Sequence, residues 1–448
     1  MSESPAPAAA GHEAPPLSRR RVPQEGPHRA PRPAHGRPVA SLAAAVAALA
    51  ASCGADEAGD PALPAPGIWR GSLASPGGPL TFGLDLVAED AGLRAVLVNG
   101  EERREAGYVL VRDDGRVAFE IPPYRSEIVA TVAEGGEALR GTWSRDRGAG
   151  PVEELPFAAV RGASEPSLPP LSAEEIAAVS GRWSVRFAAD EHDSVGEFRV
   201  GSDGRADGTF LTTLGDYRYL SGWYAQSTLL LSCFDGAHAF LFAATLQDDG
   251  TLTGDFWSRG AYHDTWTARR EDGATLPDDF ALTEWTGAVA LSELAFEDLD
   301  GVERSLDDPS FASPARLIVL FGTWCPNCND LTDYLVELDE RYEALSILGI
   351  AFELGEDEEA HRRAVRDYLG HHGADFPVLL AGTSDKRAAS AAFPLVDRVR
   401  AYPTTVFLDG AGEVSAVHTG FSGPATGEHH ARLRERFESE IDRLVGAR

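Results

Sequence analysis

Two stretches of the chain alternate apolar and polar residues in short runs, the pattern of strands in an antiparallel sheet. Runs such as 93–98 and 128–132 lack a helical period and are separated by turns rich in Gly and Asp. The first stretch opens at Gly67-Ile68-Trp69 and the second at Gly181-Arg182-Trp183, and later landmarks keep the same order. We therefore predict two β-rich repeats, 67–162 and 181–272, each an antiparallel barrel or sandwich.

From about Leu291 the pattern changes to strands that alternate with amphipathic helices. Apolar runs of strand length lie at 317–321, 345–352, 376–380 and 404–408, and helical spacing is found at 330–338, 361–369 and 427–445. This alternation is typical of an α/β domain with a mixed sheet. The predicted fold class is therefore multidomain, with two antiparallel β-rich repeats followed by an α/β domain over 291–448.

The first 53 residues have the pattern of a targeting segment. Residues 1–38 are rich in Pro, Ala, Arg and His and are expected to be disordered. An apolar run at 39–51, too short for a good membrane span, then leads through small residues to Cys53. These small residues resemble a bacterial lipobox, which implies that Cys53 is lipidated, although Ala50 stands where Leu is customary. Plain secretion and an ordinary Ala-rich segment are the alternatives.

Three further segments are predicted to connect these parts. Residues 54–66 would be a flexible tether, and Pro-rich residues at 163–180 and the segment 273–290 would be linkers. The chain has 448 residues, a hydrophobic fraction of 43% and a formal charge of -30. Such an acidic chain repels phosphate backbones and anionic headgroups, so nucleic-acid binding is excluded and membrane attachment would require the lipid.

Two of the four cysteines form the motif Cys325-Pro326-Asn327-Cys328, between a predicted buried strand and a helix. The positive end of a helix favours a thiolate on the first cysteine, and the second is close enough to resolve a mixed disulfide. A zinc site would need four ligands and no second pair exists, so neither metal nor cofactor is expected. A purely structural disulfide is the other alternative.

The sequence Trp324-Cys325-Pro326-Asn327-Cys328, with Tyr402-Pro403 downstream, resembles the TlpA-like group of thioredoxin-fold redoxins. The resemblance covers 291–448. It implies a thioredoxin-like domain with Cys325 as nucleophile, Cys328 as resolving thiol, and Trp324, Pro326, Tyr402 and Pro403 as supporting residues. It also implies a cis peptide bond before Pro403, beside the cysteine pair.

The chain departs from that family at two positions, with Val319 in place of a buried Asp and Leu331 in place of a Glu. The proton acceptor for Cys328 must then lie elsewhere, and Glu353, directly after the strand 345–352, is the candidate. The alternative is that Glu353 is an ordinary solvated carboxylate. Cys233 and His238, in the second repeat, are expected to be structural rather than reactive.

These observations predict an envelope thiol-disulfide oxidoreductase that acts on protein thiols and disulfides through the Cys325/Cys328 couple. Its location would be the bacterial cell envelope, as a periplasm-facing lipoprotein, and the sequence does not identify the electron donor. One alternative is a binding or scaffold lipoprotein in which the repeats have the main role. The other is a thiol peroxidase, which the chain disfavours because no Pro-x-x-x-Thr element precedes Cys325.

Overall fold

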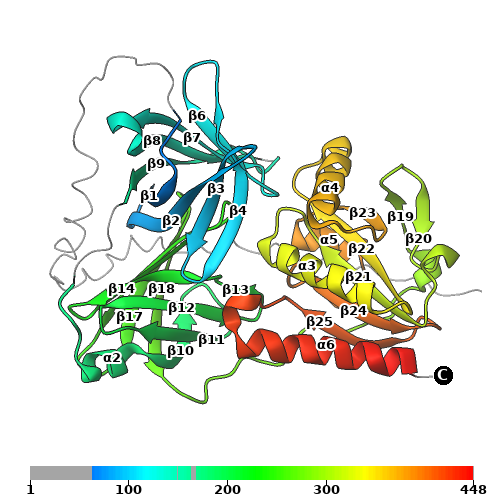
Figure 1. The fold of residues 1–448 in the computed structure, drawn as a ribbon. Helices are drawn as coiled ribbons and strands as arrows, with labels where there is room; N and C mark the ends of the chain where they lie inside the picture. The colour runs from blue at the N-terminus through cyan, green and yellow to red at the C-terminus, as the bar shows by residue number, and fades with distance from the viewer. Residues whose placement is uncertain (1–62, 149, 163–167, 447–448) are drawn as a thin grey trace, which may run out of the picture. The chain divides into compact units, whose positions relative to one another are not determined.

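The computed structural model describes residues 63–148, 150–162 and 168–446. The predicted targeting segment with Cys53, most of the tether and part of the first linker lie outside the described residues. Within the described ranges, no helix is long and apolar enough to cross a membrane. The elements form three sheets, two of nine strands and one of seven (Figure 1). The prediction of a β-rich chain with barrel-like sheets is confirmed.

The first repeat is an antiparallel sheet in the order β4-β3-β2-β1-β9-β8-β7-β6-β5. The predicted strands at 93–98 and 128–132 are confirmed as β3 and β7. The sheet curls so that β4 approaches β6, where a Cβ on Gly107 would lie 3.2 Å from the carbonyl oxygen of Glu120. The strands are β1 (Gly67–Ser75), β2 (Gly78–Glu89), β3 (Gly92–Asn99), β4 (Glu102–Tyr108), β5 (Leu110–Val111), β6 (Val117–Ile121), β7 (Ser126–Ala133), β8 (Ala138–Arg145) and β9 (Glu153–Arg161).

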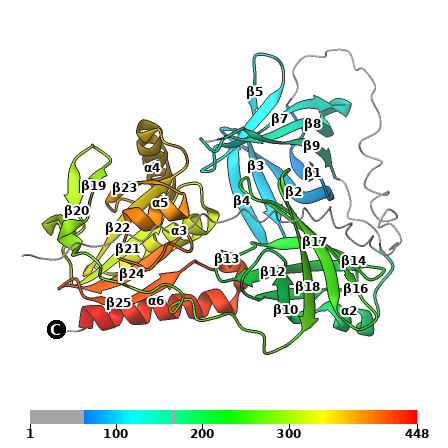
Figure 2. The same ribbon diagram turned by 180° about the vertical axis from the view of Figure 1, so that it is seen from behind.

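The second repeat is a closed barrel, because β11 pairs with β12 as well as with β10 (Figure 2). Its interior is filled by aromatic rings, among them Phe210, Phe242 and Trp266, which contact one another and are buried. The strands are β10 (Gly181–Phe187), β11 (Ser194–Val200), β12 (Arg205–Thr212), β13 (Gly215–Asp216), β14 (Leu220–Ala225), β15 (Thr228–Phe234), β16 (Ala239–Leu246), β17 (Leu252–Ser258) and β18 (Tyr262–Arg270).

The opening tryptophans of the two repeats are held in the same way. The indole nitrogen of Trp69 donates to the carbonyl of Ala65, and that of Trp183 donates to the carbonyl of Val179, in each case four residues earlier. The glycines that open the two repeats have nearly equal φ angles, +127° at Gly67 and +126° at Gly181, a region that favours glycine. The landmarks found in the sequence therefore mark equivalent backbone positions.

The first predicted linker contains a helix that we did not expect, α2 (Ala173–Val179). Ser172 caps it: its hydroxyl accepts from the amide of Glu175, and the Glu175 carboxylate accepts from the amide of Ser172. This capping box satisfies backbone groups at the start of the helix, and Val179 at its end is buried beside Trp183. The Pro-rich composition before it concealed this local signal.

The third sheet has the order β20-β19-β23-β22-β21-β24-β25 and follows the repeats in the chain. Its core strands β21, β22 and β23 run parallel, and β24 pairs antiparallel to β21. The strands are β19 (Ala295–Asp298), β20 (Glu303–Ser305), β21 (Ala315–Phe321), β22 (Leu345–Glu353), β23 (Val378–Thr383), β24 (Thr404–Asp409) and β25 (Val414–Thr419). The helices are α3 (Pro326–Arg341), α4 (Glu358–His372), α5 (Lys386–Ala392) and α6 (Glu428–Gly446).

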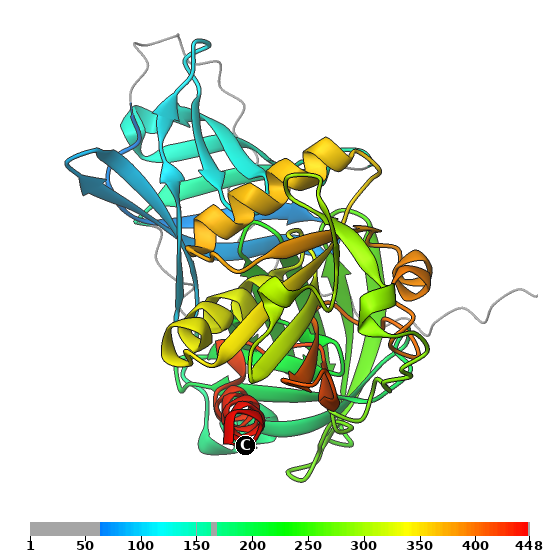
Figure 3. The same cartoon turned by 90° about the vertical axis from the view of Figure 1, so that its right-hand side faces the viewer.

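Helices cover both faces of this sheet. Both crossovers from β21 to β22 and from β22 to β23 move in the same direction along the sheet, so the right-handed rule places α3 and α4 on one face. Helix α6 joins that face, where the hydroxyl of Tyr334 in α3 donates to the carbonyl of Arg434. Figure 3 shows α3, α4 and α6 on one side of the sheet and α5 on the other.

The segment predicted as the second linker, 273–290, packs on this α/β domain. Trp285 forms an isolated β-bridge with Val396, and the amide of Thr286 donates to the carbonyl of Leu395. The ring of Phe280 lies 4.7 Å from that of His418. These apolar side chains explain why the segment is attached rather than free, since leaving them in water would cost burial energy.

The capping box at α2 can be tested by a change of one hydroxyl. Ser172→Ala should lower the free energy of unfolding by about 1 kcal/mol, because an amide at the helix start loses its partner. The matched control is Ser202→Ala, an exposed serine whose hydroxyl makes no hydrogen bond among the described residues. Urea denaturation followed by tryptophan fluorescence gives both values, and equal stability of the two variants would contradict the cap.

Candidate redox site

The cysteine pair lies where β21 passes into α3. Cys325 is the N-cap of the helix and Pro326 its first residue, a position that proline suits because it has no amide hydrogen to leave unpaired. The carbonyl of Cys325 accepts from the amides of Cys328 and Asn329 at 3.1 and 3.2 Å. Both cysteines are free thiols in this structure. The first thiol is therefore fixed at the positive end of the helix.

The thiol of Cys325 meets the loop before β24. Its Sγ donates to the carbonyl oxygen of Tyr402 at 3.3 Å, and the peptide bond from Tyr402 to Pro403 is cis, as the resemblance implied. Cys325 is 6% exposed and Cys328 only 1%. Burial raises the pKa of the Cys328 thiol well above its usual value, and the neighbouring Cys325 adds to the rise. The buried Cys328 thiol is therefore held in its protonated form.

Trp324 is anchored beside the pair. Its indole nitrogen donates to the carbonyl of Phe352 at 3.0 Å, and its ring meets that of Tyr402 edge-on at 5.6 Å. A Cβ on Gly322 would lie 2.3 Å from that indole nitrogen and 2.7 Å from the Phe352 oxygen. Glycine at 322 is thus required for Trp324 to reach the neighbouring strand.

Glu353 is buried at 4% exposure, so the alternative of an ordinary solvated carboxylate is wrong. Its two carboxylate oxygens accept from the amide and the hydroxyl of Thr323, at 2.8 and 2.7 Å. Burial raises the pKa of Glu353 to about 7, although the bonds from Thr323 oppose the rise. This carboxyl group can therefore gain or lose a proton near neutral pH. Its hydrogen-bond partner Thr323 precedes Cys325 by two residues.

A second set of polar side chains supports the backbone of the motif from α3 and α4. The Asn329 amide donates to the carbonyl of Cys325, and the His372 ring lies between the Asn329 oxygen at 2.9 Å and Asp333 at 2.6 Å. The Tyr368 hydroxyl donates to the carbonyl of Cys328 at 2.9 Å. These residues form no motif that is recognisable in the sequence, and the one local signal is that Asn329 and Asp333 are four apart and so share a helix face.

Both repeats contact the motif. Arg145, in β8, donates to the carbonyl of Trp324 at 3.0 Å, and the Asn327 side chain donates to the carbonyl of Leu214 at 3.2 Å. Gly215 is so close that a Cβ there would lie 1.8 Å from the amide nitrogen of Asn327. The two repeats therefore hold the motif in place through Trp324 and Asn327.

A buried charge cluster adjoins the same helix. Arg218 pairs with Asp330, with Glu102 at 2.6 Å and with Asp235 at 3.4 Å, and its side chain is 4% exposed. Burial opposes the charge of Arg218, but the three carboxylates raise its pKa. Burial raises the pKa of Asp330 to about 6. No sequence signal connects these residues, because Arg218 is more than a hundred positions from Glu102 and from Asp330.

Cys233 and His238 are structural, as predicted. Cys233 is fully buried in the barrel core, where burial raises its pKa well above the usual value. The His238 ring is bonded to Asp235 at 3.0 Å, next to Arg218. Among the described residues, no group of three or more His, Cys, Asp or Glu side chains is arranged to hold a metal ion.

The chain is similar in sequence to known thioredoxin-like proteins. No family model matches the chain. It is 27% identical to the thioredoxin-like protein YneN of Bacillus subtilis over 129 residues, 29% of this chain and 68% of the relative. It is 29% identical to the thiol-disulfide oxidoreductase ResA of Geobacillus kaustophilus over 152 residues, 33% of this chain and 79% of the relative.

Among solved structures, a thioredoxin-like protein from Aeropyrum pernix is similar at 20% identity and a TM-score of 0.26, covering 33% of this chain and 88% of that one. The curated relatives confirm the resemblance to thioredoxin-fold redoxins over roughly a third of the chain. The protein is therefore an oxidoreductase of the thiol-disulfide type in that part.

The burial of Glu353 predicts a pH dependence of stability. Since its pKa is about 7 in the folded state and 4.5 as an ordinary glutamate, the stability it contributes is present below pH 4.5 and is lost as the pH rises through 7. The loss amounts to about 3 kcal/mol at most. Glu353→Gln should remove it, because an amide can bond to Thr323 without carrying charge.

The measurement is chemical denaturation at pH 5 and pH 8. The unmodified protein should lose more stability between these two pH values than Glu353→Gln does. Glu413→Gln, at an exposed carboxylate, is the matched control and should behave like the unmodified protein. If Glu353→Gln lost as much stability between pH 5 and pH 8 as the unmodified protein, the pKa of Glu353 would not be raised by burial.

Proposed function

We propose that the protein exchanges disulfides with protein substrates through Cys325 and Cys328. The observation that carries this proposal is the position of the Cys325 thiol, at the start of α3 and 3.3 Å from the Tyr402 carbonyl. A thiol at that end of a helix is stabilised as thiolate, the reactive form. Cys328, one helical turn further and buried, is placed to act second.

In the reducing direction, the Cys325 thiolate attacks one sulfur of the substrate disulfide. That S–S bond breaks, the mixed disulfide forms, and the departing substrate sulfur takes up a proton. Cys328 then loses its proton and attacks the Cys325 sulfur, which releases the second substrate thiol. Two electrons pass to the substrate, the pair becomes a disulfide, and an external dithiol restores it. The oxidising direction follows the same steps in reverse.

Glu353 is our candidate acceptor for the proton of Cys328. Its pKa of about 7 lies near the pH at which a thiol must be deprotonated, and a buried negative charge near Cys328 also contributes to the raised pKa of that thiol. No hydrogen bond joins Glu353 to Cys328 among the described residues, so the proton would pass after a small movement or through water. Trp324, Pro326, Tyr402 and Pro403 would support the pair as the resemblance implies.

We assign the domains as predicted, with repeats at 67–162 and 181–272 and the thioredoxin-like domain at 291–448. The repeats would contribute to the redox activity rather than have a separate function. The support is that Arg145 and Leu214 contact the cysteine motif and that Arg218 contacts the helix after it. This argues against repeats that have an independent scaffolding role.

We place the protein in the bacterial cell envelope as a periplasm-facing lipoprotein, attached through Cys53. The support is the sequence of the targeting segment and the acidic composition, which leaves a lipid as the means of attachment. A single acyl chain holds a protein only weakly, so stable attachment requires the multiple acylation that the lipobox resemblance implies.

The first test separates the two cysteines. Cys325→Ser should lower the turnover of insulin disulfides by about a thousandfold or more, because the other thiols of the described residues, Cys328 and Cys233, are more deeply buried. Cys328→Ser should still attack and then accumulate a mixed disulfide, visible by mass spectrometry without reductant. Cys233→Ala, at the buried structural thiol, is the control and should retain turnover. Unchanged turnover in Cys325→Ser would overturn the proposal.

A second test concerns the N-terminus. Mass spectrometry of the protein from bacterial membranes should find a mature chain that begins at Cys53 and carries acyl groups. Cys53→Ser should release the protein from the membrane fraction. A mature chain that keeps residues upstream of Cys53, or an unmodified Cys53, would contradict the lipid anchor.

A further inference from the structure

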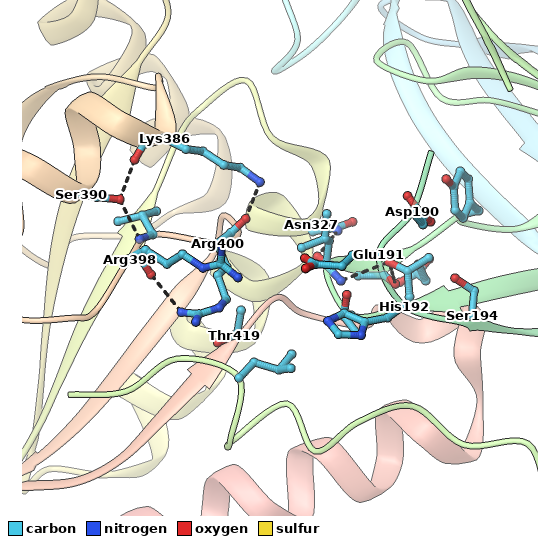
Figure 4. A pocket seen from close by; sticks show the side chains of 18 of the residues that line it. Asp190, Glu191, His192, Ser194, Asn327, Lys386, Ser390, Arg398, Arg400 and Thr419 are labelled. Carbon is cyan, nitrogen blue, oxygen red and sulfur yellow. Dashed lines mark hydrogen bonds between the residues drawn. The ribbon is translucent and has the colours of Figure 1, made fainter. Parts of the chain in front are cut away.

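A cavity of about 750 Å³ lies next to the redox site, with walls from the thioredoxin-like domain and from the second repeat. Figure 4 shows the two walls: Lys386, Ser390, Arg398 and Arg400 on one side, Asp190, Glu191 and His192 on the other, and Asn327 between them. A volume of this size accommodates a short peptide or a drug-sized molecule.

The first wall carries unpaired positive charge. Lys386, Arg387 and Arg398 are exposed side chains that form no ion pair with any carboxylate of the described residues, whereas Arg400 is bonded by both terminal nitrogens to Asp397. The protein has 70 acidic and 40 basic residues, so a group of cations without partners stands out against its surroundings. Such a group attracts anions, and more strongly where the walls of a cavity limit the access of water.

The opposite wall is acidic and comes from the connection between β10 and β11. Asp190 and Glu191 line it, and no ion pair joins either of them to the cationic wall among the described residues. Burial raises the pKa of Asp190, and nearby Asp264 adds to the rise. The two walls are therefore not neutralised by pairing with each other, and a carboxylate entering the cavity is directed to the side of Lys386 and Arg398.

The cationic wall is connected to the reactive thiol. The Lys386 ammonium group donates to the carbonyl of Arg400, two residues before Tyr402, whose own carbonyl accepts from Cys325. Asn327, between the two cysteines of the motif, also lines the cavity. A ligand held by Lys386 and Arg398 would thus lie against Asn327 of the motif and near the loop whose Tyr402 carbonyl contacts Cys325.

We propose that this cavity is the substrate subsite of the dithiol and that it selects disulfides flanked by carboxylates, with Lys386, Arg387 and Arg398 as the groups that bind them. The proposal rests on the proposed function, and it names the substrate class of the same site. The carboxylates could belong to Asp and Glu beside a cysteine of a protein substrate, or to a small acidic disulfide, and the experiment distinguishes these two sources.

The experiment measures how fast the reduced full chain reduces each of three oxidised peptides. The peptides share one disulfide loop and differ only in the two residues that flank it, which are both Glu, both Gln or both Lys. The rate of peptide reduction should be about tenfold higher for the Glu than for the Lys peptide at low ionic strength, and the ratio should fall as salt is added. Glutathione disulfide provides the small acidic substrate. If it is favoured over the Glu peptide, the source is a small molecule rather than a protein segment.

Variants assign the preference to the cavity. The double variant Lys386→Gln with Arg398→Gln should reduce the Glu-to-Lys ratio to about twofold, and Lys386→Arg, which keeps the charge, should preserve it. Arg363→Gln removes an exposed and unpaired charge on α4, outside the cavity, and should leave the ratio unchanged. Equal rates for the Glu and Lys peptides in the unmodified protein would overturn the subsite while leaving thiol-disulfide exchange established.

Lys386 is the single lysine of the sequence, which allows a test that does not depend on catalysis. Acetylation of this residue, followed by mass spectrometry, should slow several-fold in the presence of the Glu peptide and not in the presence of the Lys peptide. If none of the disulfides is reduced, the proposed function fails, and this protection measurement alone decides whether the cavity binds carboxylates. Equal acetylation with both peptides would overturn the subsite.

Discussion

The buried guanidinium group of Arg218 forms ion pairs that connect both repeats with the helix that carries the cysteine motif. A buried arginine without partners would cost several kcal/mol, so its surroundings must supply carboxylates. They come from three places: Glu102 in the first repeat, Asp235 in the second and Asp330 on the helix that follows the cysteine pair. One positive charge thus serves three buried carboxylates, so removal of Arg218 would leave all three without this partner, and the two repeats and helix α3 are joined through it.

This arrangement holds the cysteine motif in place. Asp330 follows Cys328 by two residues, so the ion pair with Arg218 holds the first turn of α3 against the barrel. Arg145 and Leu214 hold the motif through Trp324 and Asn327. Cys325 itself is 6% exposed and contacts Tyr402 and Asn329 of its own domain, so the repeats act on the motif through its neighbours rather than through the thiol.

Much of the thioredoxin-like domain could be predicted from the sequence because its signals are local. A buried strand, a cysteine motif at the start of a helix and a Tyr402-Pro403 element each occupy consecutive residues. The equivalence of Trp69 and Trp183 could likewise be inferred from landmarks that recur in both repeats. The helix α2 was missed because its Pro-rich flank masked a capping box that was present in the sequence.

The rest of the site depends on long-range contacts for which the sequence has no pattern. In the sequence, Glu353 is a polar residue at the end of a predicted strand. Only the fold shows that both of its carboxylate oxygens accept hydrogen bonds from Thr323 on an adjacent segment of the chain. The Arg218 cluster joins residues 112 and 116 positions apart. Charged side chains are usually exposed, so composition and periodicity assign them to the surface unless their partners are known.

The barrel of the second repeat acts through its loops rather than its interior. Phe210, Phe242 and Trp266 fill the interior, so no ligand can occupy it without displacing the core. The short strand β13 instead reaches the redox domain, because Asp216 in β13 accepts from the amide of Gly423 at 2.5 Å. The same carboxylate accepts from the amide of Arg218 at 2.7 Å. A rigid, filled barrel can position such loops accurately, which is the usual division between scaffold and binding site. The aromatic core therefore serves the redox site indirectly, because it fixes the loop that contacts the cysteine motif.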